Sequence, residues 1–435
     1  MCLFQLVCVF FLAVIARTQE LQSCNVDAVP SIIGSTEDAG ALATAILGCP
    51  DGSIAVQWVG EVFVEETIRV TNGTSLDITG AGPGAIADGG STTQLFYVEG
   101  GSSLHLSDLT LTHGNASNGG AISVFVSNSA VGNRFNSDGG AGAGGAIFVW
   151  RSNLSWEVDD AVFSKNTAED GGGAIFAWES TVSWNGDGAE FSNNAAGQNI
   201  GNGEENGSGG AIFAWESTVT WNGGGSEFRN NTAGLWGGAI ATYSGSTVFW
   251  SGDVTEFSAN AAGYEGGAIS ATVSNVSWEG DGTVFVANTA DLAGGAIAAV
   301  QGRVSWKGDG TEFSNNAAAG NGAAIFASYD SFVSMDDSTT FRSNVAGGNG
   351  GALAISELTE FEPVGPFIGT AFIDNRAGFA GGAIYLINCE KGLNFTDVTF
   401  ESNSASGSGG AVAAFTSGYE FDPMTFTGCT FLNNK

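Results

Sequence analysis

Basic residues are scarce in this sequence. Only 12 Lys and Arg residues stand against 45 Asp and Glu residues, which leaves a formal net charge of -33. An acidic surface of this kind repels nucleic acid and anionic membranes, so we expect no nucleic-acid partner. The charge suits neutral or cationic partners, and high solubility is its simpler consequence.

Charged residues make up only 13% of the chain, whereas glycine reaches 68 residues. This composition excludes a mainly helical protein and fits short strands joined by many tight turns. Apolar runs long enough to span a membrane are absent after the first 18 residues. Residues 1–18 predict a secretory signal, because Leu3 to Ile15 is almost wholly apolar, although no positive charge precedes it. We therefore expect a secreted or cell-surface, extracellular protein without a transmembrane segment.

Cysteine is rare, with 6 residues in the chain. In an oxidising compartment we expect a disulfide between Cys24 and Cys49, and Cys389 and Cys429 form a second candidate pair. The triplet N-x-S/T, the acceptor of N-glycosylation in secreted eukaryotic proteins, occurs at Asn72, Asn115, Asn153, Asn206, Asn230, Asn275 and Asn394. Such triplets also arise by chance in a chain rich in Asn and Ser, so they support the secreted assignment without carrying it alone.

Two short motifs alternate along most of the chain. GGAI or a close variant has its alanine at Ala121, Ala146, Ala174, Ala211, Ala239, Ala268, Ala296, Ala324, Ala352, Ala383 and Ala411. FxxN has its phenylalanine at Phe163, Phe191, Phe228, Phe257, Phe285, Phe313, Phe341, Phe372, Phe400 and Phe431, with a variant at Phe135. A tryptophan precedes six of these phenylalanines, at Trp156, Trp184, Trp221, Trp250, Trp278 and Trp306. The period of about 28 residues, with an insertion around Gln198–Gly207, is typical of a solenoid.

The residues of one repeat predict three short strands. In residues 174–194 these are Ala174 to Trp178, Thr181 to Trp184 and Glu190 to Ser192, separated by glycine-rich turns. Strands this short must pair with the equivalent strands of neighbouring repeats, which stack about 4.8 Å apart. The predicted fold is therefore all-β, a right-handed parallel β-helix solenoid over residues 61–435, regular from about residue 105.

Alternation along each strand assigns the faces of the predicted coil. Ile175, Ala177, Val182, Trp184 and Phe191 lie in columns that hardly vary between repeats, so we predict them inside. The FxxN asparagines fall at turns, where the side-chain amides of stacked coils can bond to one another. We expect their role to be structural.

The two ends of the solenoid differ in sequence. Residues 19–60 predict an N-terminal cap with a short helix at Ser35–Gly48, in which Ser35 is the N-cap and Asp38 follows three residues later. This helix would cover the open edge of the first coil. After the last FxxN only Lys435 follows, so either the sequence is a fragment or another chain contacts the uncapped final coil.

The alternation of GGA[ILV] with FxxN resembles the repeat of the chlamydial polymorphic membrane proteins over about residues 105–435. The resemblance implies a surface-exposed β-helical passenger that is used for adhesion to host cells. The N-glycosylation triplets and the regular tryptophans depart from that family and suggest another setting, such as the wall or matrix of a eukaryotic microbe or alga. We therefore carry over the fold and the surface interaction, and not the membrane anchor.

An acidic column precedes the phenylalanines by four residues. Its members are Asp159, Asp187, Asp253, Asp281, Asp309 and Asp337, with Gly224 interrupting. Stacked coils place these like charges about 5 Å apart, which is unfavourable unless they are solvated, screened or bridged. We favour turn aspartates that bond their own backbone, and a string of weak Ca²⁺ sites is the alternative.

An aromatic column lies at outward positions of the first strand. It consists of Phe148, Trp150, Phe176, Trp178, Phe213, Trp215 and Tyr243. Later coils lose these aromatics while the inner columns continue, so core packing alone does not explain them. Two interpretations stay open: the column is an exposed binding surface, or the nine-residue insertion or the N-terminal region covers it.

Many right-handed β-helices are polysaccharide lyases, hydrolases or epimerases, whose sites need clustered carboxylates or Ca²⁺ beside a base. The bases are scattered here, with only Arg303 and Lys307 close together in one coil, and His105 and His113 show no triad. We therefore predict no cofactor and a non-enzymatic surface or matrix protein that mediates adhesion by binding a glycan or another protein. The alternative is a carbohydrate-active enzyme with a divergent site.

Overall fold

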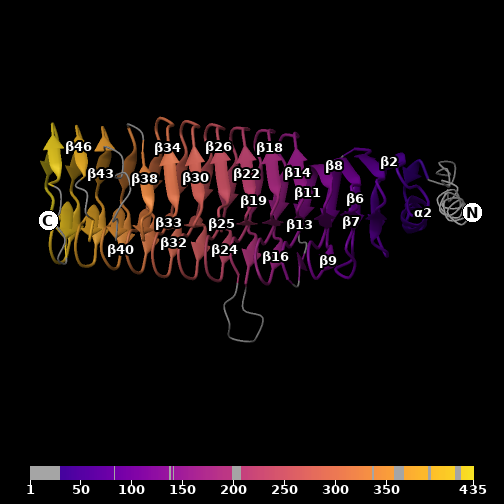
Figure 1. The fold of residues 1–435 in the computed structure, drawn as a ribbon, viewed down its shortest axis with the longest axis horizontal. Coiled ribbons are helices and arrows are strands. Elements are labelled where there is room, and N and C mark those ends of the chain that lie inside the picture. The colour runs from indigo at the N-terminus through magenta and orange to yellow at the C-terminus, as the bar shows by residue number, and fades with distance from the viewer. Residues whose placement is uncertain are drawn as a thin grey trace, which may run out of the picture.

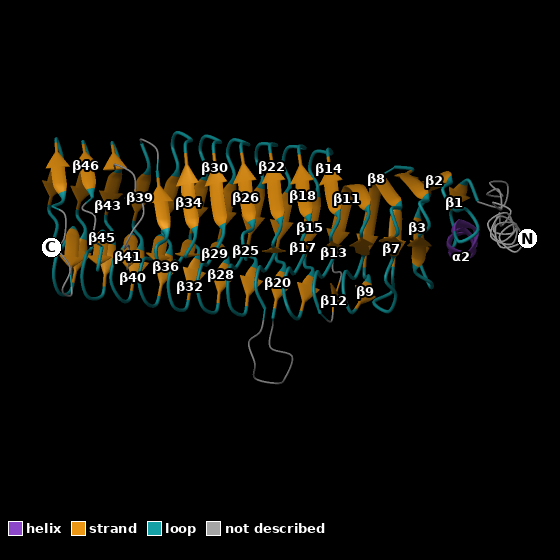
Figure 2. Cartoon of the chain, in the orientation of Figure 1, coloured by secondary structure: helices purple, strands orange, loops and turns teal. Residues whose placement is uncertain are grey.

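The computed structural model describes residues 30–82, 84–136, 139–140, 142–197, 207–335, 338–356, 367–389, 393–416 and 423–435. The described residues form one elongated parallel β-solenoid, with the first coils at one tip and the last coils at the other (Figure 1). In the described residues the strands make four sheets, with 24, 13, 11 and 3 strands. The described part contains a single helix (Figure 2). The predicted all-β parallel β-helix is confirmed.

One coil shows how the sequence builds these sheets. β17 (Ile175–Trp178), β18 (Thr181–Trp184) and β19 (Glu190–Ser192) are the three predicted strands, the first beginning one residue later than expected. β17 belongs to the 13-stranded sheet, and β18 and β19 belong to the 24-stranded sheet. A further strand, β20 (Ala195–Ala196), lies in the 11-stranded sheet. Two residues are too few to show alternation, so the sequence did not predict this strand.

The 13-stranded sheet contains the GGAI segments and positions the candidate site. Its strands pair in register, as in the row Trp150, Trp178 and Trp215. In spatial order they are β4 (Ile68–Val70), β7 (Phe96–Glu99), β10 (Ile122–Phe125), β13 (Ile147–Trp150), β17, β21 (Ile212–Trp215), β25 (Ile240–Tyr243), β29 (Ile269–Thr272), β33 (Ile297–Val300), β37 (Ile325–Ser328), β41 (Leu353–Ser356), β45 (Ile384–Ile387) and β49 (Val412–Phe415).

The geometry of the turn before β17 explains the two glycines of GGAI, a pair that precedes most of these strands. Gly172 has a φ of 61°, in the left-handed region that strains other residues. A side chain on Gly173 would collide with the carbonyl oxygen of Gly210 in the next coil. The glycine pair therefore lets the chain turn tightly into β17 while adjacent coils stay in contact.

Columns of identical side chains fill the interior. Ile175, Ala177, Val182, Trp184 and Phe191 are each 0% exposed, which confirms their predicted inward orientation. Adjacent indoles stack with centroids 4.7–4.8 Å apart and planes within 6° in the column Trp156, Trp184, Trp221, Trp250, Trp278 and Trp306. The sequence thus repeats one set of core contacts from coil to coil.

The FxxN asparagines form a buried ladder along the solenoid. The Nδ2 of each asparagine except the last donates to the Oδ1 of the asparagine one coil further on, at 2.9–3.0 Å. The Nδ2 also donates to a phenylalanine carbonyl of the preceding coil, as Asn260 does to Phe228 at 2.8 Å. The asparagine ladder consists of Asn166, Asn194, Asn231, Asn260, Asn288, Asn316, Asn344, Asn375, Asn403 and Asn434. The predicted structural role is confirmed.

The N-terminal end carries the predicted helix. α2 (Thr36–Ile46) follows Ser35, whose Oγ accepts the backbone N–H of Asp38 at 3.2 Å, and it buries Leu42 and Ile46. The helix lies against β1 (Ile32–Ile33) and β3 (Glu61–Phe63) and contacts β4, next to the first coil.

The cysteines give two different outcomes. The predicted signal and Cys24 lie outside the described residues, so the Cys24–Cys49 disulfide stays a prediction; Cys49 itself is buried. The candidate pair of Cys389 and Cys429 is wrong, because no disulfide joins them. The Sγ of Cys389 lies 3.5 Å from the carbonyl of Ile387, and that of Cys429 lies 3.5 Å from the carbonyl of Phe395.

Candidate functional site

The predicted aromatic column lies on the outer face of the 13-stranded sheet, over β13, β17, β21 and β25. We call its seven members, Phe148, Trp150, Phe176, Trp178, Phe213, Trp215 and Tyr243, the aromatic stripe. In-register pairing of the strands places each aromatic beside its counterpart in the next coil. Phe176 and Phe213 have ring centroids 4.8 Å apart, and Trp178 and Trp215 have centroids 6.1 Å apart.

The two columns of the stripe differ in exposure. Phe148, Phe176 and Phe213 are only 7–8% exposed, so of the two interpretations left open by the sequence, the exposed surface does not apply to these three rings. The turns that precede the GGAI segments cover them: Ala143 and Trp236 pack against these rings. This cover consists of residues of the coils themselves, whereas the insertion that the sequence suggested lies at residues 198–206, outside the described residues.

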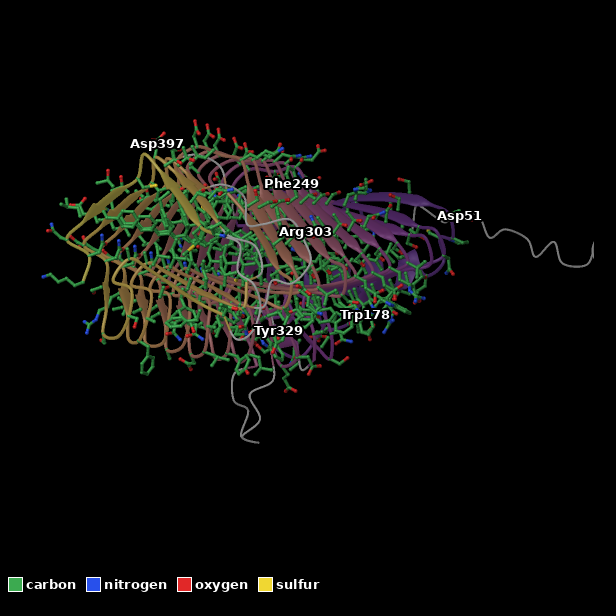
Figure 3. The ribbon with its side chains drawn as sticks, turned by 60° about the vertical axis from the view of Figure 1, so that its left-hand side comes forward. Asp51, Trp178, Phe249, Arg303, Tyr329 and Asp397 are labelled. Atoms are coloured by element: carbon green, nitrogen blue, oxygen red, sulfur yellow. The ribbon has the colours of Figure 1, made fainter. Side chains whose placement is uncertain are left out.

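The outer column of the stripe remains open. Trp178 is 42% and Trp215 is 37% exposed, and Trp178 projects from the solenoid (Figure 3). Trp150 and Tyr243 are half-buried at either end of this pair. An open row of indoles on a buried aromatic base is a rigid apolar surface, of the kind that marks binding sites.

Four further aromatics extend the stripe, and the sequence analysis missed them. Tyr97 and Phe125 continue it toward the N-terminus, with ring centroids 5.2 Å apart. Trp236 and Tyr264 continue it at the other end, where the Trp236 ring stands edge-on to Tyr243 at 5.8 Å and to Tyr264 at 6.0 Å. Tyr97 precedes the first GGAI segment, and Phe125 follows it in the strand that pairs with Trp150. Trp236 and Tyr264 lie in turns outside both motifs, so extending the strand alignment would have found only Tyr97 and Phe125.

Acidic side chains border the open column. The Trp215 Nε1 donates to Glu216 at 3.3 Å. Glu179 accepts the Arg151 Nε at 2.8 Å, which lowers the pKa of this carboxyl group, and the Arg151 guanidinium lies 5.1 Å from the Trp150 ring. These carboxylates suit hydroxyl groups or cations beside the aromatic faces.

The end of the stripe at Tyr243 is partly desolvated. Burial raises the pKa of Tyr243 to about 12, and the nearby carboxylate of Glu265 contributes to this increase. Burial also raises the pKa of Glu265. A phenol hydroxyl and a carboxylate therefore stand together at this end, beside the Trp236 ring.

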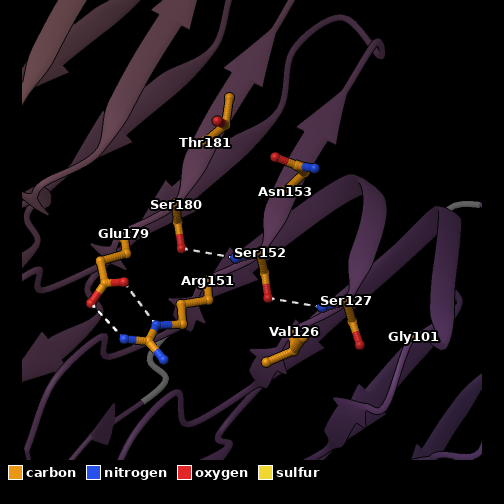
Figure 4. Close-up of a pocket in the computed structure, with 9 residues that line it drawn as sticks. All are labelled: Gly101, Val126, Ser127, Arg151, Ser152, Asn153, Glu179, Ser180 and Thr181. Atoms are coloured by element: carbon orange, nitrogen blue, oxygen red, sulfur yellow. Dashed lines mark hydrogen bonds and ion pairs between the residues drawn. The ribbon is translucent and has the colours of Figure 1, made fainter.

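A polar groove adjoins the stripe at the corner between the 13-stranded and 24-stranded sheets (Figure 4). It has a volume of about 320 Å³ and is lined by Gly101, Val126, Ser127, Arg151, Ser152, Asn153, Glu179, Ser180 and Thr181. Its floor is a serine ladder, in which the backbone N–H of Ser127 donates to Ser152 Oγ at 3.1 Å and that of Ser152 to Ser180 Oγ at 3.2 Å. The groove thus offers hydroxyl, amide and charged groups next to Trp150 and Trp178.

The acidic column is held by hydrogen bonds between coils. The Oδ1 of Asp159 accepts the backbone N–H of Asp187 at 3.0 Å, and the Oδ1 of Asp281 accepts that of Asp309 at 2.9 Å. Asp253 bonds to Asp281 in the same way, and Asp187 to Gly224. These bonds reach the next coil, which corrects the expectation that each aspartate bonds its own backbone.

The alternative interpretation of the aspartate column, a string of Ca²⁺ sites, is not supported by the arrangement of the side chains. In the part of the chain that the structure describes, no group of three or more His, Cys, Asp or Glu side chains could hold a metal ion. Asp337, the last member of the column, lies outside that part.

The residues weighed for catalysis lie in separate contacts along the solenoid. The His113 Nδ1 lies 3.1 Å from the Asp88 carboxylate. Lys307 pairs with Glu279 at 3.7 Å, and the Arg303 guanidinium lies 5.4 Å from the Phe332 ring. His105 stands opposite Asp77 in the paired strands β5 (Ser75–Gly80) and β8 (Ser103–Thr112). The structure therefore brings Arg303 and Lys307 into separate contacts.

Comparison with known families identifies the repeat. Residues 160–177, 221–243, 310–328 and 397–414 match the Chlamydia polymorphic membrane protein repeat. Each matched segment contains one FxxN and the GGA that follows it, except residues 310–328, where Ala323 replaces the second glycine. The chain carries polymorphic membrane protein repeats. In this structure the two motifs of that repeat supply the asparagine ladder and the turn into the 13-stranded sheet.

The polymorphic membrane protein repeat implies a location at the cell surface or outer membrane. Searches among curated proteins and solved structures give no match. Among the described residues, no helix is long and apolar enough to cross a membrane.

Proposed function

We propose that this protein is a non-enzymatic surface protein that mediates adhesion by binding a glycan along the open column of the aromatic stripe. The observation that carries the proposal is the outward row of Trp150, Trp178, Trp215 and Tyr243, of which Trp178 and Trp215 are 42% and 37% exposed. Indole faces pack well against the apolar C–H faces of sugar rings. A fold that repeats its core has no packing reason to keep such residues on its surface.

The spacing of the row suits a linear ligand that lies along the solenoid axis. Each coil contributes one ring, and the ring centroids are 6.1 Å apart between Trp178 and Trp215 and 5.9 Å apart between Trp215 and Tyr243. These distances are close to the length of one pyranose unit in an extended polysaccharide. One sugar could therefore face each coil from Trp150 to Tyr243.

Polar groups beside the row favour the same class of ligand. Glu179, Glu216 and the Tyr243 hydroxyl lie beside the row and can bond sugar hydroxyls. The net charge of -33 disfavours polyanionic glycans. We therefore propose a neutral or amino-sugar glycan.

A glycan array probed with the purified protein, with and without Ca²⁺, tests the proposal. The variant Trp150→Ala/Trp178→Ala/Trp215→Ala should lose binding at least 100-fold and keep a cooperative melting transition, because the covered Phe148, Phe176 and Phe213 are retained. Phe379→Ala, which removes a 66% exposed aromatic elsewhere, is the matched control and should bind normally. Unchanged binding by a folded triple variant would show that the interaction surface lies elsewhere.

The enzymatic alternative is tested in the same experiment. Each glycan that binds is incubated with the protein, and new reducing ends or unsaturated products are measured. Turnover that persists in the triple variant would replace the adhesion proposal by a carbohydrate-active enzyme whose site lies away from the stripe.

A further inference from the structure

The N-glycosylation triplets are sorted by position in the fold. The acceptor asparagines within the described residues are all exposed, at Asn72, Asn115, Asn153, Asn230, Asn275 and Asn394. The seventh, Asn206, lies outside the described residues.

Strand alternation explains the exposure of three of them. Asn153, Asn275 and Asn394 begin β14 (Asn153–Trp156), β30 (Asn275–Trp278) and β46 (Asn394–Thr396). The middle residue of each triplet, Leu154, Val276 or Phe395, is at most 1% exposed and points inward. The asparagine before it must then point outward.

The buried asparagines show the opposite pattern. Nine members of the ladder are followed two residues later by alanine and so cannot be acceptors: Asn166, Asn194, Asn231, Asn260, Asn288, Asn316, Asn344, Asn375 and Asn403. Asn230 and Asn231 are neighbours in the chain, yet the acceptor Asn230 is exposed while Asn231 is 0% exposed. A glycan on a ladder asparagine would remove its Nδ2 bonds and force a sugar into the core. The fold therefore tolerates modification at every described triplet.

The acceptors are also distributed unevenly among the four sheets. β14 and β30 belong to the 24-stranded sheet, β9 (Asn115–Ala116) to the 11-stranded sheet and β46 to the 3-stranded sheet. Asn72 and Asn230 lie in turns, with φ of 58° and 53°. The 13-stranded sheet, whose outer face bears the aromatic stripe, carries no acceptor on its strands in the described residues.

We infer that N-glycans at these six asparagines coat three sheets of the solenoid and leave the face of the 13-stranded sheet bare. Asn153 and Asn275 hold equivalent places in the 24-stranded sheet four coils apart, which is roughly 19 Å at the usual strand spacing. Two glycans fit at this distance without collision. Asn153 also lines the groove, where Arg151 and Thr181 can bond the first sugar.

The inference is tested on the full chain, secreted from a eukaryotic cell by means of a signal peptide of that host. The protein is treated with peptide N-glycosidase in H₂¹⁸O, which converts each glycosylated asparagine to ¹⁸O-labelled aspartate, and peptides are mapped by mass spectrometry. We expect label at the six exposed acceptors, at Asn230 and not Asn231. A secreted protein without label, or with label on the asparagine ladder, overturns the inference.

Two variants sharpen this test. Asn153→Gln should remove one glycan from the intact mass, whereas Asn222→Gln, at an exposed asparagine outside any triplet, should leave the mass of the glycans unchanged. Trp178→Asn creates a new acceptor on the bare face, because Ser180 already stands two residues later. Glycosylation of the new asparagine at position 178 would show that the outer face of the 13-stranded sheet is accessible and lacks glycans only because it lacks acceptors. An unmodified Trp178→Asn variant would contradict the accessibility of this face.

A measurement of ligand binding with and without the N-glycans separates this inference from the proposed function. This measurement is the one part of the test that rests on the proposed function. Enzymatic removal of the natural glycans should leave ligand affinity unchanged within twofold, because none of them lies on the aromatic stripe. A loss of affinity with full occupancy at all six sites would overturn the bare-face inference alone. No binding before and after removal would count against the proposed function while the mapped sites stand.

Discussion

The asparagine ladder allows a quantitative prediction for Asn260→Ala. The Asn260 side chain is 0% exposed and takes part in four hydrogen bonds. Its Oδ1 accepts the backbone N–H and the Nδ2 of Asn231, both at 3.0 Å, and its Nδ2 donates to Phe228 at 2.8 Å and to Asn288 at 3.0 Å. At about 1 kcal/mol for each bond, and more where a buried partner is left unpaired, the loss is about 4–6 kcal/mol.

The defect should be local, because each coil contacts only its neighbours. Hydrogen–deuterium exchange followed by mass spectrometry should show peptides around Asn231, Asn260 and Asn288 exchanging up to roughly 1,000-fold faster, as about 4 kcal/mol implies. Peptides near β4 should be unchanged. Asn222→Ala is the matched control, because Asn222 also bonds a stacked asparagine, Asn185 at 2.9 Å, but does so at an exposed position. If the two variants exchanged alike, the ladder would contribute nothing beyond a surface amide pair, and the reasoning would fail.

Two further predictions concern the core and the pH dependence. Trp250→Ala should lower the free energy of unfolding, measured by urea titration, by about 3–5 kcal/mol, because the indole is buried between two stacked neighbours. Ser277→Ala on the outer face should change the same free energy by less than about 0.5 kcal/mol. Equal effects of the two substitutions would refute the assignment of the inner and outer faces. Burial raises the pKa of Glu265 above its ordinary value of 4.5, so the folded state holds the proton more tightly than the unfolded state. The stabilisation by protonated Glu265 should be complete below pH 4.5 and be lost as the pH rises through the raised pKa, and Glu265→Gln should abolish that decline; a parallel decline in both proteins would assign it to another group.

The fold was predictable because the period carries most of the information. Repetition at about 28 residues fixed the coil, and alternation then placed Val182, Trp184 and Phe191 inside without any knowledge of the neighbouring coils. The asparagine ladder was predictable for the same reason, since a polar residue at one turn position must meet its own copy in the next coil.

The site was predictable only in part, because its cover comes from residues outside the motifs. Phe176 and Trp178 alternate with the inward residues and look equally exposed in the sequence. Ala143 and Trp236 bury the phenylalanine column, yet they occupy a turn position whose residue differs in every coil of this region. The prediction for the aspartate column was wrong for a related reason. An aspartate that bonds the next coil and one that bonds its own turn occur at the same spacing in the sequence, so the sequence does not distinguish the two hydrogen bonds.

The orientation of the hydrogen bonds between coils has a mechanical consequence. The strands run across the long axis of the solenoid, so the bonds that join successive coils point along it (Figure 2). A force applied along this axis loads one interface between coils at a time and breaks its hydrogen bonds before those of the next interface. Each coil of 28 residues that detaches adds roughly 90–100 Å of extended chain, while the coils behind it keep their own contacts. A protein anchored at one tip and bound at another point would therefore lengthen in steps under tension and absorb a pull that would break a short, rigid link.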